Sequence, residues 1–212
     1  KKHMKILDNY KMADEEEKAL MFFDALDNFK INGWEHISID HFAKPSDSLV
    51  HAKKDKTMTR SFIGFSSGSC DNMLGIGPSS TIRVDDYYFQ NTCNLNTYSE
   101  KVMNGIFPIT SGYKMTDDDL IRREVIENFL CQDGINVVEI ENRYHINFKS
   151  YFEEELLDLE RFIKDDMLES NEHELKITEL GKVFNRHICR VFDKFLKNKE
   201  YKIHGTGNKD HI

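Results

Sequence analysis

The sequence lacks the features that mark several common classes of protein. Its four cysteines stand at positions 70, 93, 131 and 189, so the chain holds no closely spaced thiolate loop for a metal or an iron–sulfur cluster. No apolar run approaches the roughly 20 residues that span a bilayer, and the charged N-terminal segment lacks the apolar core of a signal peptide. We therefore predict a cytoplasmic protein with reduced cysteines and no membrane partner.

An excess of positive charge is missing as well. The 212 residues include 29 basic and 37 acidic side chains, a net charge of −8, which argues against nucleic acid as the main partner. The histidines show no common spacing typical of a metal site, so we predict none in this chain. A hydrophobic fraction of 39%, with 15 phenylalanines, is enough for a folded core.

The first 40 residues predict a helix, a tight turn and a strand. Asp14 and Glu17 have capping-box spacing, and apolar residues recur at helical intervals from position 19 to 29. Gly33 is a typical helix end, and alternating isoleucines up to position 39 indicate a strand. This order is one repeat of an α/β barrel, where chemistry gathers at the carboxyl ends of strands, so Asp40 and His41 are substrate-side candidates. The alternative is that His41 only binds a backbone carbonyl at the barrel rim.

The rest of the chain divides near residue 110. Before it we expect strands at 61–65 and 81–84 and a helix at 95–103; the stretch 105–112, with Pro108, is typical of a boundary. After it, Thr116 caps a helix that reaches residue 130, followed by a helix at 148–163, a hairpin at 167–177 and a helix at 178–195. We predict an α+β, helix-rich fold with domains at 1–110 and 111–200 and a frayed tail at 201–212. The second domain is winged-helix-like.

Two groups of residues resemble one enzyme family. They are residues 33–45, with the sequence GWEHISIDHFAKP, and residues 60–65 and 73–81, with the sequences RSFIGF and MLGIGPSST. These segments closely resemble the oxygen-independent coproporphyrinogen III oxidases, which are radical S-adenosylmethionine enzymes. The resemblance extends from about residue 13 to about residue 195. It implies the last repeat of a radical S-adenosylmethionine barrel, followed by a helical C-terminal lobe.

The resemblance also implies where cofactor and substrate bind. In the family, the loop that matches Gly75, Gly77 and Thr81 lines a second S-adenosylmethionine position, and the residue that matches Phe62 lies nearby. Many relatives carry an aliphatic residue where this chain has Thr81. From the residues alone, Gly75-x-Gly77 followed by a proline indicates a sharp turn rather than a dinucleotide site.

Two further motifs match the family on the substrate side. Gln90, in a Y-x-Q-N run, offers an amide donor for a carboxylate, and Arg122 and Arg123, in the run IRREVI, offer bidentate guanidinium groups for a propionate. The alternatives are a surface turn for Gln90 and ordinary surface ion pairs with acids of the same helix for the two arginines.

The activity that the resemblance implies is oxidative decarboxylation of two propionates of coproporphyrinogen III to vinyl groups. S-adenosylmethionine and a 4Fe-4S cluster serve the complete enzyme, where a 5′-deoxyadenosyl radical abstracts hydrogen from a propionate. The cluster ligands would precede Lys1, in a missing barrel region or a partner chain. We therefore expect no catalytic residue in this chain and no activity of the chain alone.

Two alternatives compete with this interpretation. Haem-chaperone relatives tend to carry H-N-x-x-Y-W and G-A-x-x-H runs, which this chain replaces at 60–65 and 77–80. A winged-helix regulatory module could read DNA with the last helix, whose basic residues are Lys182, Arg186, Arg190 and Lys194. The net charge and the apolar stripe of that helix favour packing in the interior instead.

Overall fold

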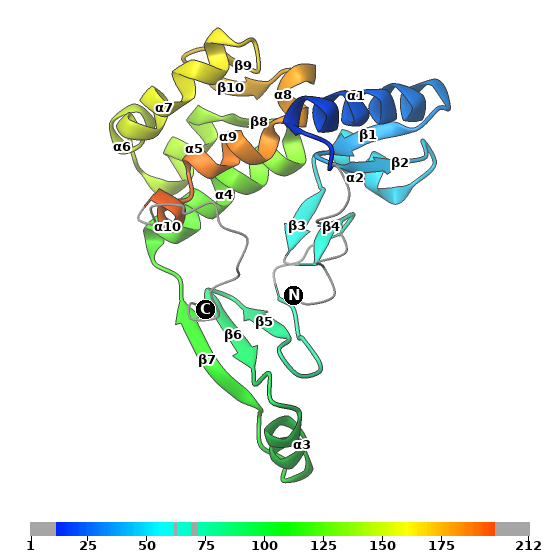
Figure 1. Ribbon diagram of the computed structural model, residues 1–212. Helices are drawn as coiled ribbons and strands as arrows, with labels where there is room; N and C mark the ends of the chain where they lie inside the picture. Colours follow the sequence, from blue (N-terminus) through cyan, green and yellow to red (C-terminus); the bar gives the residue numbers. More distant parts are fainter. Residues whose placement is uncertain (1–11, 62, 69–71, 198–212) are drawn as a thin grey trace.

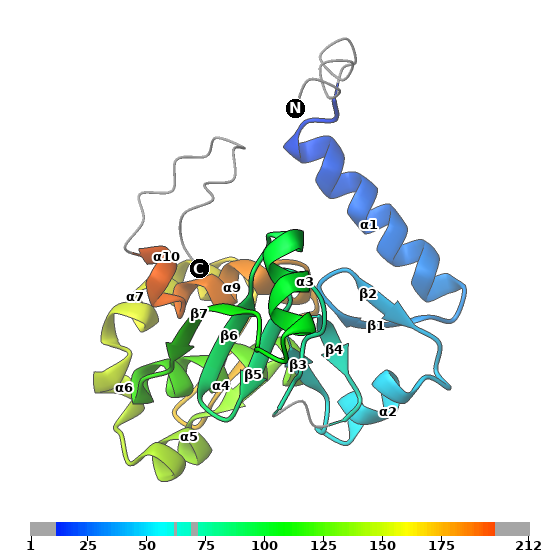
Figure 2. The same ribbon diagram turned by 90° about the horizontal axis from the view of Figure 1, so that it is seen from below.

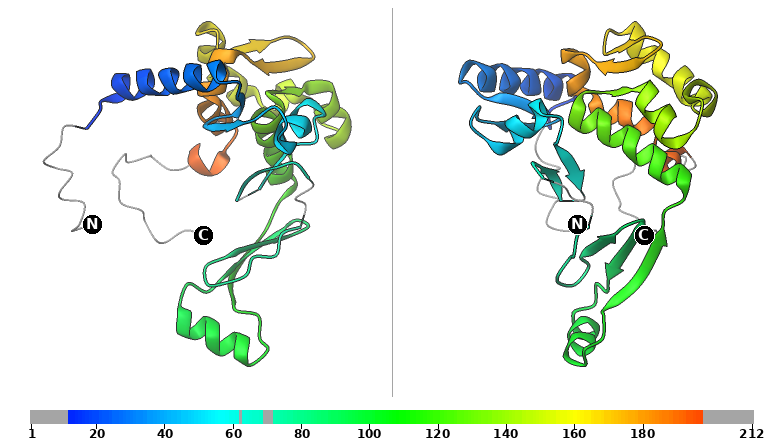
Figure 3. Two further views of the ribbon diagram at one scale, coloured as in Figure 1. Left: turned by 90° about the vertical axis from the view of Figure 1, so that its right-hand side faces the viewer. Right: turned by 180° about the vertical axis from the view of Figure 1, so that it is seen from behind.

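The structure, a computed structural model, describes residues 12–61, 63–68 and 72–197. It has an N-terminal part, a helical C-terminal lobe, and an arm of three strands and one helix that projects away from both (Figure 1). Seen from below, the arm lies in front of the lobe while α1 extends to one side (Figure 2). The two views of Figure 3 show the same projection.

The N-terminal part begins with the predicted capping box. The Asp14 carboxylate accepts from the Glu17 amide at 2.9 Å, and the Glu17 carboxylate accepts from the Asp14 amide at 3.0 Å, which fixes the start of the helix. The elements that follow are α1 (Glu15–Ile31), β1 (Glu35–Ser38), β2 (His41–Ala43), α2 (Ser48–Lys54), β3 (Thr59–Ser61) and β4 (Gly64–Ser66).

The segment around Asp40 and His41 differs from the expected strand end. β1 pairs antiparallel with β2, so Asp40 lies in the turn of a hairpin and His41 begins the returning strand. Ile39 turns the chain with φ of 50°, and the His36 ring bonds to its carbonyl at 2.8 Å. The segment 35–43, predicted as a single strand that ends at residue 39, is therefore a two-stranded hairpin, because the turn at Ile39 reverses the chain.

The arm consists of an antiparallel sheet in the order β5-β6-β7 and a helix at its far end. Its elements are β5 (Thr81–Val84), β6 (Tyr87–Asn91), α3 (Leu95–Met103) and β7 (Ile109–Lys114). The predicted strand at 81–84 and helix at 95–103 are confirmed at the same residues, whereas β6 and β7 were not expected. β7 crosses the predicted domain boundary at 110 and pairs with β6; the boundary itself stays a prediction.

The C-terminal lobe confirms the predicted hairpin and breaks two of the predicted helices. The hairpin at 167–177 is β9–β10, joined by a third strand, β8, that was not predicted. Each break lies at a phenylalanine, at Phe152, Phe184 and Phe192. The elements are α4 (Asp117–Gln132), β8 (Gly134–Asn136), α5 (Val137–Tyr144), α6 (Phe148–Tyr151), α7 (Glu153–Lys164), β9 (Leu168–Ser170), β10 (Glu174–Ile177), α8 (Glu179–Val183), α9 (Asn185–Val191) and α10 (Lys194–Lys197).

Three phenylalanines explain why two of those helices break. The rings of Phe129 and Phe152 lie 5.6 Å and 5.3 Å from that of Phe192, and all three are fully buried. The breaks at Phe152 and Phe192 coincide with this contact between rings that are distant in the sequence. Tertiary packing of large aromatic side chains therefore outweighs local periodicity. Helical spacing from Phe152 and Leu159 predicts a buried Ile163, but Ile163 is 37% exposed and its neighbour Phe162 is buried instead.

One hydrophobic core joins the N-terminal part to the C-terminal lobe. Ile37 and Val50 belong to the same buried cluster as the three phenylalanines, and among the described residues this cluster includes none from the arm. Asn185, completely buried, donates to the Phe129 carbonyl at 2.8 Å and so satisfies a polar group inside the core. The arm is therefore held by its own sheet and by contacts at its base.

The sequence predicts that the apolar stripe of α1, formed by Leu20, Phe23 and Leu26, is only partly covered. In the structure Leu26 is buried, Phe23 is half-buried and Leu20 is 59% exposed, and the neighbouring Met21 is 64% exposed. An exposed apolar stripe favours self-association. We expect the double variant Leu20→Lys/Met21→Lys to bind an apolar-surface dye less and to sediment as a smaller species than the wild type. Asp27→Lys, at an exposed polar position of the same helix, is the control and should change neither measurement.

Candidate functional site

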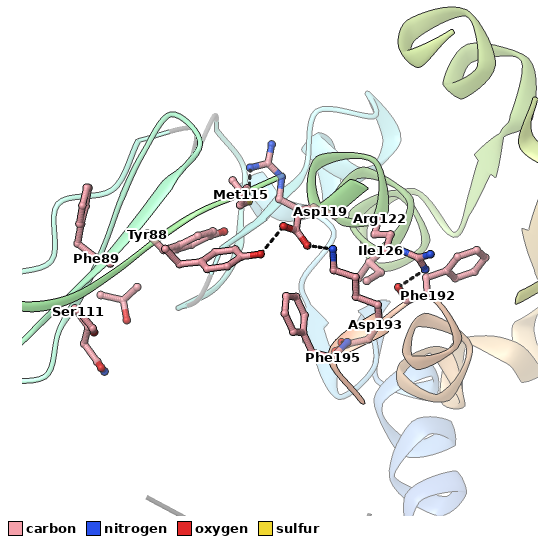
Figure 4. Close-up of a pocket in the computed structure, with 16 residues that line it drawn as sticks. Tyr88, Phe89, Ser111, Met115, Asp119, Arg122, Ile126, Phe192, Asp193 and Phe195 are labelled. Carbon is pink, nitrogen blue, oxygen red and sulfur yellow. Dashed lines mark hydrogen bonds and ion pairs between the residues drawn. The ribbon is translucent and has the colours of Figure 1, made fainter. Parts of the chain in front are cut away.

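A cavity of about 620 Å³ lies where the arm meets the C-terminal lobe (Figure 4). Its walls come from the arm sheet, from α4, which follows the arm directly in the sequence, and from the distant segment that joins α9 to the start of α10. A cavity of this size suits a small organic ligand. Most of the wall is apolar, and its aromatic residues are Tyr88, Phe89, Tyr113, Phe192 and Phe195.

The first turn of α4 forms one edge of this cavity. Thr116 caps the helix as predicted, and Asp119 completes a capping box by accepting from the Thr116 amide at 2.8 Å. The box turns the Asp119 carboxylate back toward the end of β7. There it accepts from the Tyr113 hydroxyl at 2.6 Å and pairs with Lys194 of α10 at 2.6 Å. One carboxylate thus ties the arm, α4 and α10 together (Figure 4).

These contacts keep Asp119 ionised. Burial by itself would raise the pKa of the Asp119 carboxyl, but hydrogen bonds from Lys194, Tyr113 and Thr116 hold that pKa well below its usual range. The hydrogen bond to Asp119 raises the pKa of Tyr113 in turn. The junction is therefore a fixed anion with donors on three sides, and no proton is exchanged there near neutral pH.

Arg122 is held by groups of the chain itself. Its Nε donates to both oxygens of Asp118, at 2.9 Å and 3.1 Å, and its Nη1 donates to Glu155 at 2.9 Å and to the Phe192 carbonyl at 3.2 Å. Glu155 is only 4% exposed. The guanidinium therefore joins α4 to α7 and to the end of α9. The ion pair expected with an acid of the same helix is present at Asp118, but Arg122 is largely buried rather than on the surface, and its second acid, Glu155, comes from α7.

The structure brings three of the predicted site residues together. Thr81, Gln90 and Arg122 all line the cavity, and Thr81 pairs with Gln90 across β5 and β6. Phe62, predicted to lie near Thr81 at the cofactor position, is outside the described residues. Whether these side chains contact a cofactor or a substrate stays a prediction.

Gly75 and Gly77 shape the loop that leads into β5 without lining the cavity. A Cβ on Gly75 would lie 2.2 Å from the Thr81 carbonyl oxygen, so the chain passes too close for any side chain. Gly77 has φ of 109°, and its amide donates to the Tyr98 hydroxyl at 3.0 Å. The need for both glycines therefore arises within the arm, as the sharp-turn interpretation expects.

Asp40 and His41 lie away from this cavity. The His41 Nδ1 is 2.9 Å from Asp40, whose other oxygen is 3.5 Å from Arg186, and both side chains of the pair are exposed. Their substrate-side role stays a prediction, because Asp40 and His41 do not line the cavity that Thr81, Gln90 and Arg122 share. Sequence reasoning missed Tyr113 and Lys194. The sequence predicted the helix cap at Thr116, but no local pattern relates Lys194 to Asp119, 75 positions earlier.

The described thiols do not fit an iron–sulfur cluster. Cys131 and Cys189 are buried, and burial raises the pKa of the Cys131 thiol to about 12, whereas Cys93 is exposed elsewhere. Among residues 12–61, 63–68 and 72–197, no three potential metal ligands gather at one place. Nor does any helix in that part of the chain have the length and apolar character needed to cross a membrane.

Comparison with known proteins shows which enzymes the chain resembles. The HemN C-terminal domain model matches residues 115–184. The oxygen-independent coproporphyrinogen III oxidase of Pseudomonas aeruginosa is 37% identical over 77% of the chain, and that of Escherichia coli 32% identical over 79%. The solved E. coli coproporphyrinogen III oxidase (HemN), described as a radical SAM enzyme, matches 86% of the chain at 29% identity with a TM-score of 0.82. Over most of its length the chain is therefore similar to the C-terminal portion of the oxygen-independent coproporphyrinogen III oxidases.

The chain spans less than half the length of these three relatives: 36% and 37% of the two curated oxidases and 42% of the solved chain. The resemblance predicted from the sequence and the helix-rich α+β fold are both confirmed. In terms of the family, the cavity lies at the edge of the HemN C-terminal domain: α4 falls within the matched residues, and the arm precedes them.

The ionised Asp119 makes stability depend on pH in a predictable direction. Its pKa is lowered by folding, so its contribution is complete above the unfolded value of about 4 and is lost as the pH falls further. Between pH of about 7 and about 3, the wild type should lose more free energy of unfolding than Asp119→Asn, as measured by urea titration. Asp117→Asn, an exposed neighbour in the same turn, should behave like the wild type. Equal losses for the wild type and Asp119→Asn would contradict this role.

Proposed function

We propose that this chain is the C-terminal part of an oxygen-independent coproporphyrinogen III oxidase. The reaction is the oxidative decarboxylation of two propionates of coproporphyrinogen III to vinyl groups, giving protoporphyrinogen IX. The observation that carries the proposal is the match to the E. coli oxidase over 86% of the chain at a TM-score of 0.82. We place the enzyme in the cytoplasm, with the tetrapyrrole as its substrate. The rest of the barrel would be supplied by the same chain or by a partner chain.

In this proposal, the cavity forms part of the reaction chamber. Its size and its largely apolar, aromatic lining fit an organic ligand with a flat apolar portion. Thr81 would contact a second S-adenosylmethionine, and Gln90, on the adjacent strand, would donate to a carboxylate of the substrate. When bound, S-adenosylmethionine supplies the hydrogen-abstracting chemistry of such enzymes. The residues of this chain position and enclose the ligands, and the 4Fe-4S cluster requires thiolates from outside the described residues.

The DNA-binding alternative finds little support in the geometry. Lys182 pairs with Asp133 at 3.5 Å, and Lys194 pairs with Asp118 at 2.8 Å. Arg186, another of the four basic residues proposed to face DNA, lies 3.5 Å from the Asp40 carboxylate. Cations already paired with carboxylates release fewer counterions on binding a phosphate backbone. Salt-sensitive binding in a gel shift would favour this alternative over the oxidase.

A chimera tests the proposed function directly. The matching C-terminal part of the E. coli oxidase is replaced by residues 13–196 of this chain, and the cluster-loaded chimera is assayed for protoporphyrinogen formation without oxygen. We expect turnover and a normal cluster content, since the cluster ligands come from the E. coli portion. A folded, cluster-loaded chimera with no turnover would contradict the proposal.

Variants of the active chimera test the proposed cofactor position. Gly77→Val should abolish turnover with the cluster intact, because φ of 109° strains any L side chain and shifts the loop before Thr81. Thr81→Ile should be tolerated, because it restores the aliphatic residue of many relatives, whereas Thr81→Arg should not. His173→Ala, at an exposed position of the β9–β10 turn, should be close to neutral. Normal turnover of Gly77→Val together with loss in His173→Ala would place the active face elsewhere.

His41→Ala tests the separate proposal for the exposed hairpin turn. Asp40 and His41 do not line the cavity, so a substrate contact there requires a ligand that extends beyond it. Loss of turnover in the His41→Ala chimera, with the cluster retained, would support this contact. Unchanged turnover would assign the pair to the turn alone.

A further inference from the structure

Two neighbouring arginines of α4 line the cavity, but their surroundings differ. Arg122 donates to Asp118, to Glu155 and to the Phe192 carbonyl. The guanidinium also lies 5.3 Å from the centre of the Phe152 ring, at the edge of the core. With these acceptors in place, Arg122 forms part of the wall and has little capacity left for a ligand.

Arg123 has no such set of acceptors. Its Nε is buried without a hydrogen-bond partner, and its Nη1 has only a weak sulfur acceptor, the Met115 Sδ at 3.9 Å. No carboxylate of the described residues lies within ion-pair distance of it, although the side chain is half-buried. A desolvated guanidinium without an anion is costly, so this position is incomplete as it stands.

The other charges at the cavity are already neutralised. Lys194 pairs with Asp118 and Asp119, at 2.8 Å and 2.6 Å. Asp193 accepts from the amides of Phe195 and Leu196, at 3.0 Å and 3.3 Å, and so caps the start of α10. Among the described lining residues, Arg123 is therefore the cation that lacks a counterion. The remaining surface is largely aromatic and aliphatic.

A ligand that completes this site combines two properties. It presents a carboxylate to a planar, forked guanidinium, which binds carboxylates through two parallel hydrogen bonds. It also carries an apolar ring that packs on the aromatic walls. We propose that Arg123, rather than Arg122, binds a propionate of the tetrapyrrole in this cavity. The choice of tetrapyrrole rests on the proposed function, whereas the need for a carboxylate rests on the contacts of Arg123.

Porphyrin binding to the 212-residue chain tests this site without catalysis. The probes are coproporphyrin III, a stable oxidised form of the substrate that keeps its propionates, and etioporphyrin, which carries alkyl groups in their place. Fluorescence titration should show that Arg123→Met weakens coproporphyrin binding about tenfold, since a charged hydrogen-bonded pair is lost. Arg123→Lys should weaken it less, because it keeps the charge but not the fork. Binding of etioporphyrin should not depend on residue 123.

Arg143→Met is the matched control, because this arginine lies outside the cavity, is 60% exposed, and pairs with Glu124. It should bind both porphyrins as the wild type does. Thermal unfolding checks each variant, and Arg123→Gln replaces Arg123→Met if the latter does not fold. Wild-type affinity of a folded Arg123→Met or Arg123→Gln variant for coproporphyrin would overturn the inference, as would failure of the wild type to bind coproporphyrin.

The two proposals fail separately. An inactive chimera combined with a tenfold loss of coproporphyrin binding in Arg123→Met would reject the proposed function and keep the site. An active chimera combined with unchanged binding in Arg123→Met would keep the function and reject the role of Arg123.

Discussion

The paired carboxylates at the start of α4 hold the cavity together. Asp118 binds Arg122, Lys194 and the Tyr151 hydroxyl, while Asp119 binds Lys194 and the arm through Tyr113. The core cluster includes no described residue of the arm, so the Asp119–Tyr113 hydrogen bond, the contact of the Tyr113 and Phe195 rings and the β7–α4 connection help to hold the arm sheet against the lobe. Polar junctions depend strongly on geometry, so a small displacement of α4 would disturb all of them at once.

The same junction explains how charge is distributed around the cavity. Two acidic residues in the first turn of a helix are favourable in any protein because they face the positive end of the helix dipole. Here they also neutralise a lysine from the last helix, and Glu155 completes the set around Arg122. The cations that build the wall are thereby separated from Arg123, which remains available for an outside anion. A site of this kind separates structural from ligand-facing charges along one helix.

Elements that depend on neighbouring residues could be predicted from the sequence, whereas those that depend on contacts between distant segments could not. The capping box at Asp14, the helix cap at Thr116, the strand at 81–84 and the helix at 95–103 were all predicted, since their signals lie within a few neighbouring residues. The breaks at Phe152 and Phe192 were not, because their cause is a ring contact between segments 40 residues apart. The hairpin at Asp40 was missed because a single left-handed residue reversed the chain.

For the candidate site, the sequence by itself determined the family and the residue types that make a cavity possible. The motifs around Thr81, Gln90 and Arg122 are local, and their side chains do line one cavity. Only the tertiary structure decided which of two adjacent arginines has its donors occupied, and that Lys194 lies against Asp119. Such pairings depend on where distant helices pack, and packing is set by the whole buried core rather than by any short run of residues.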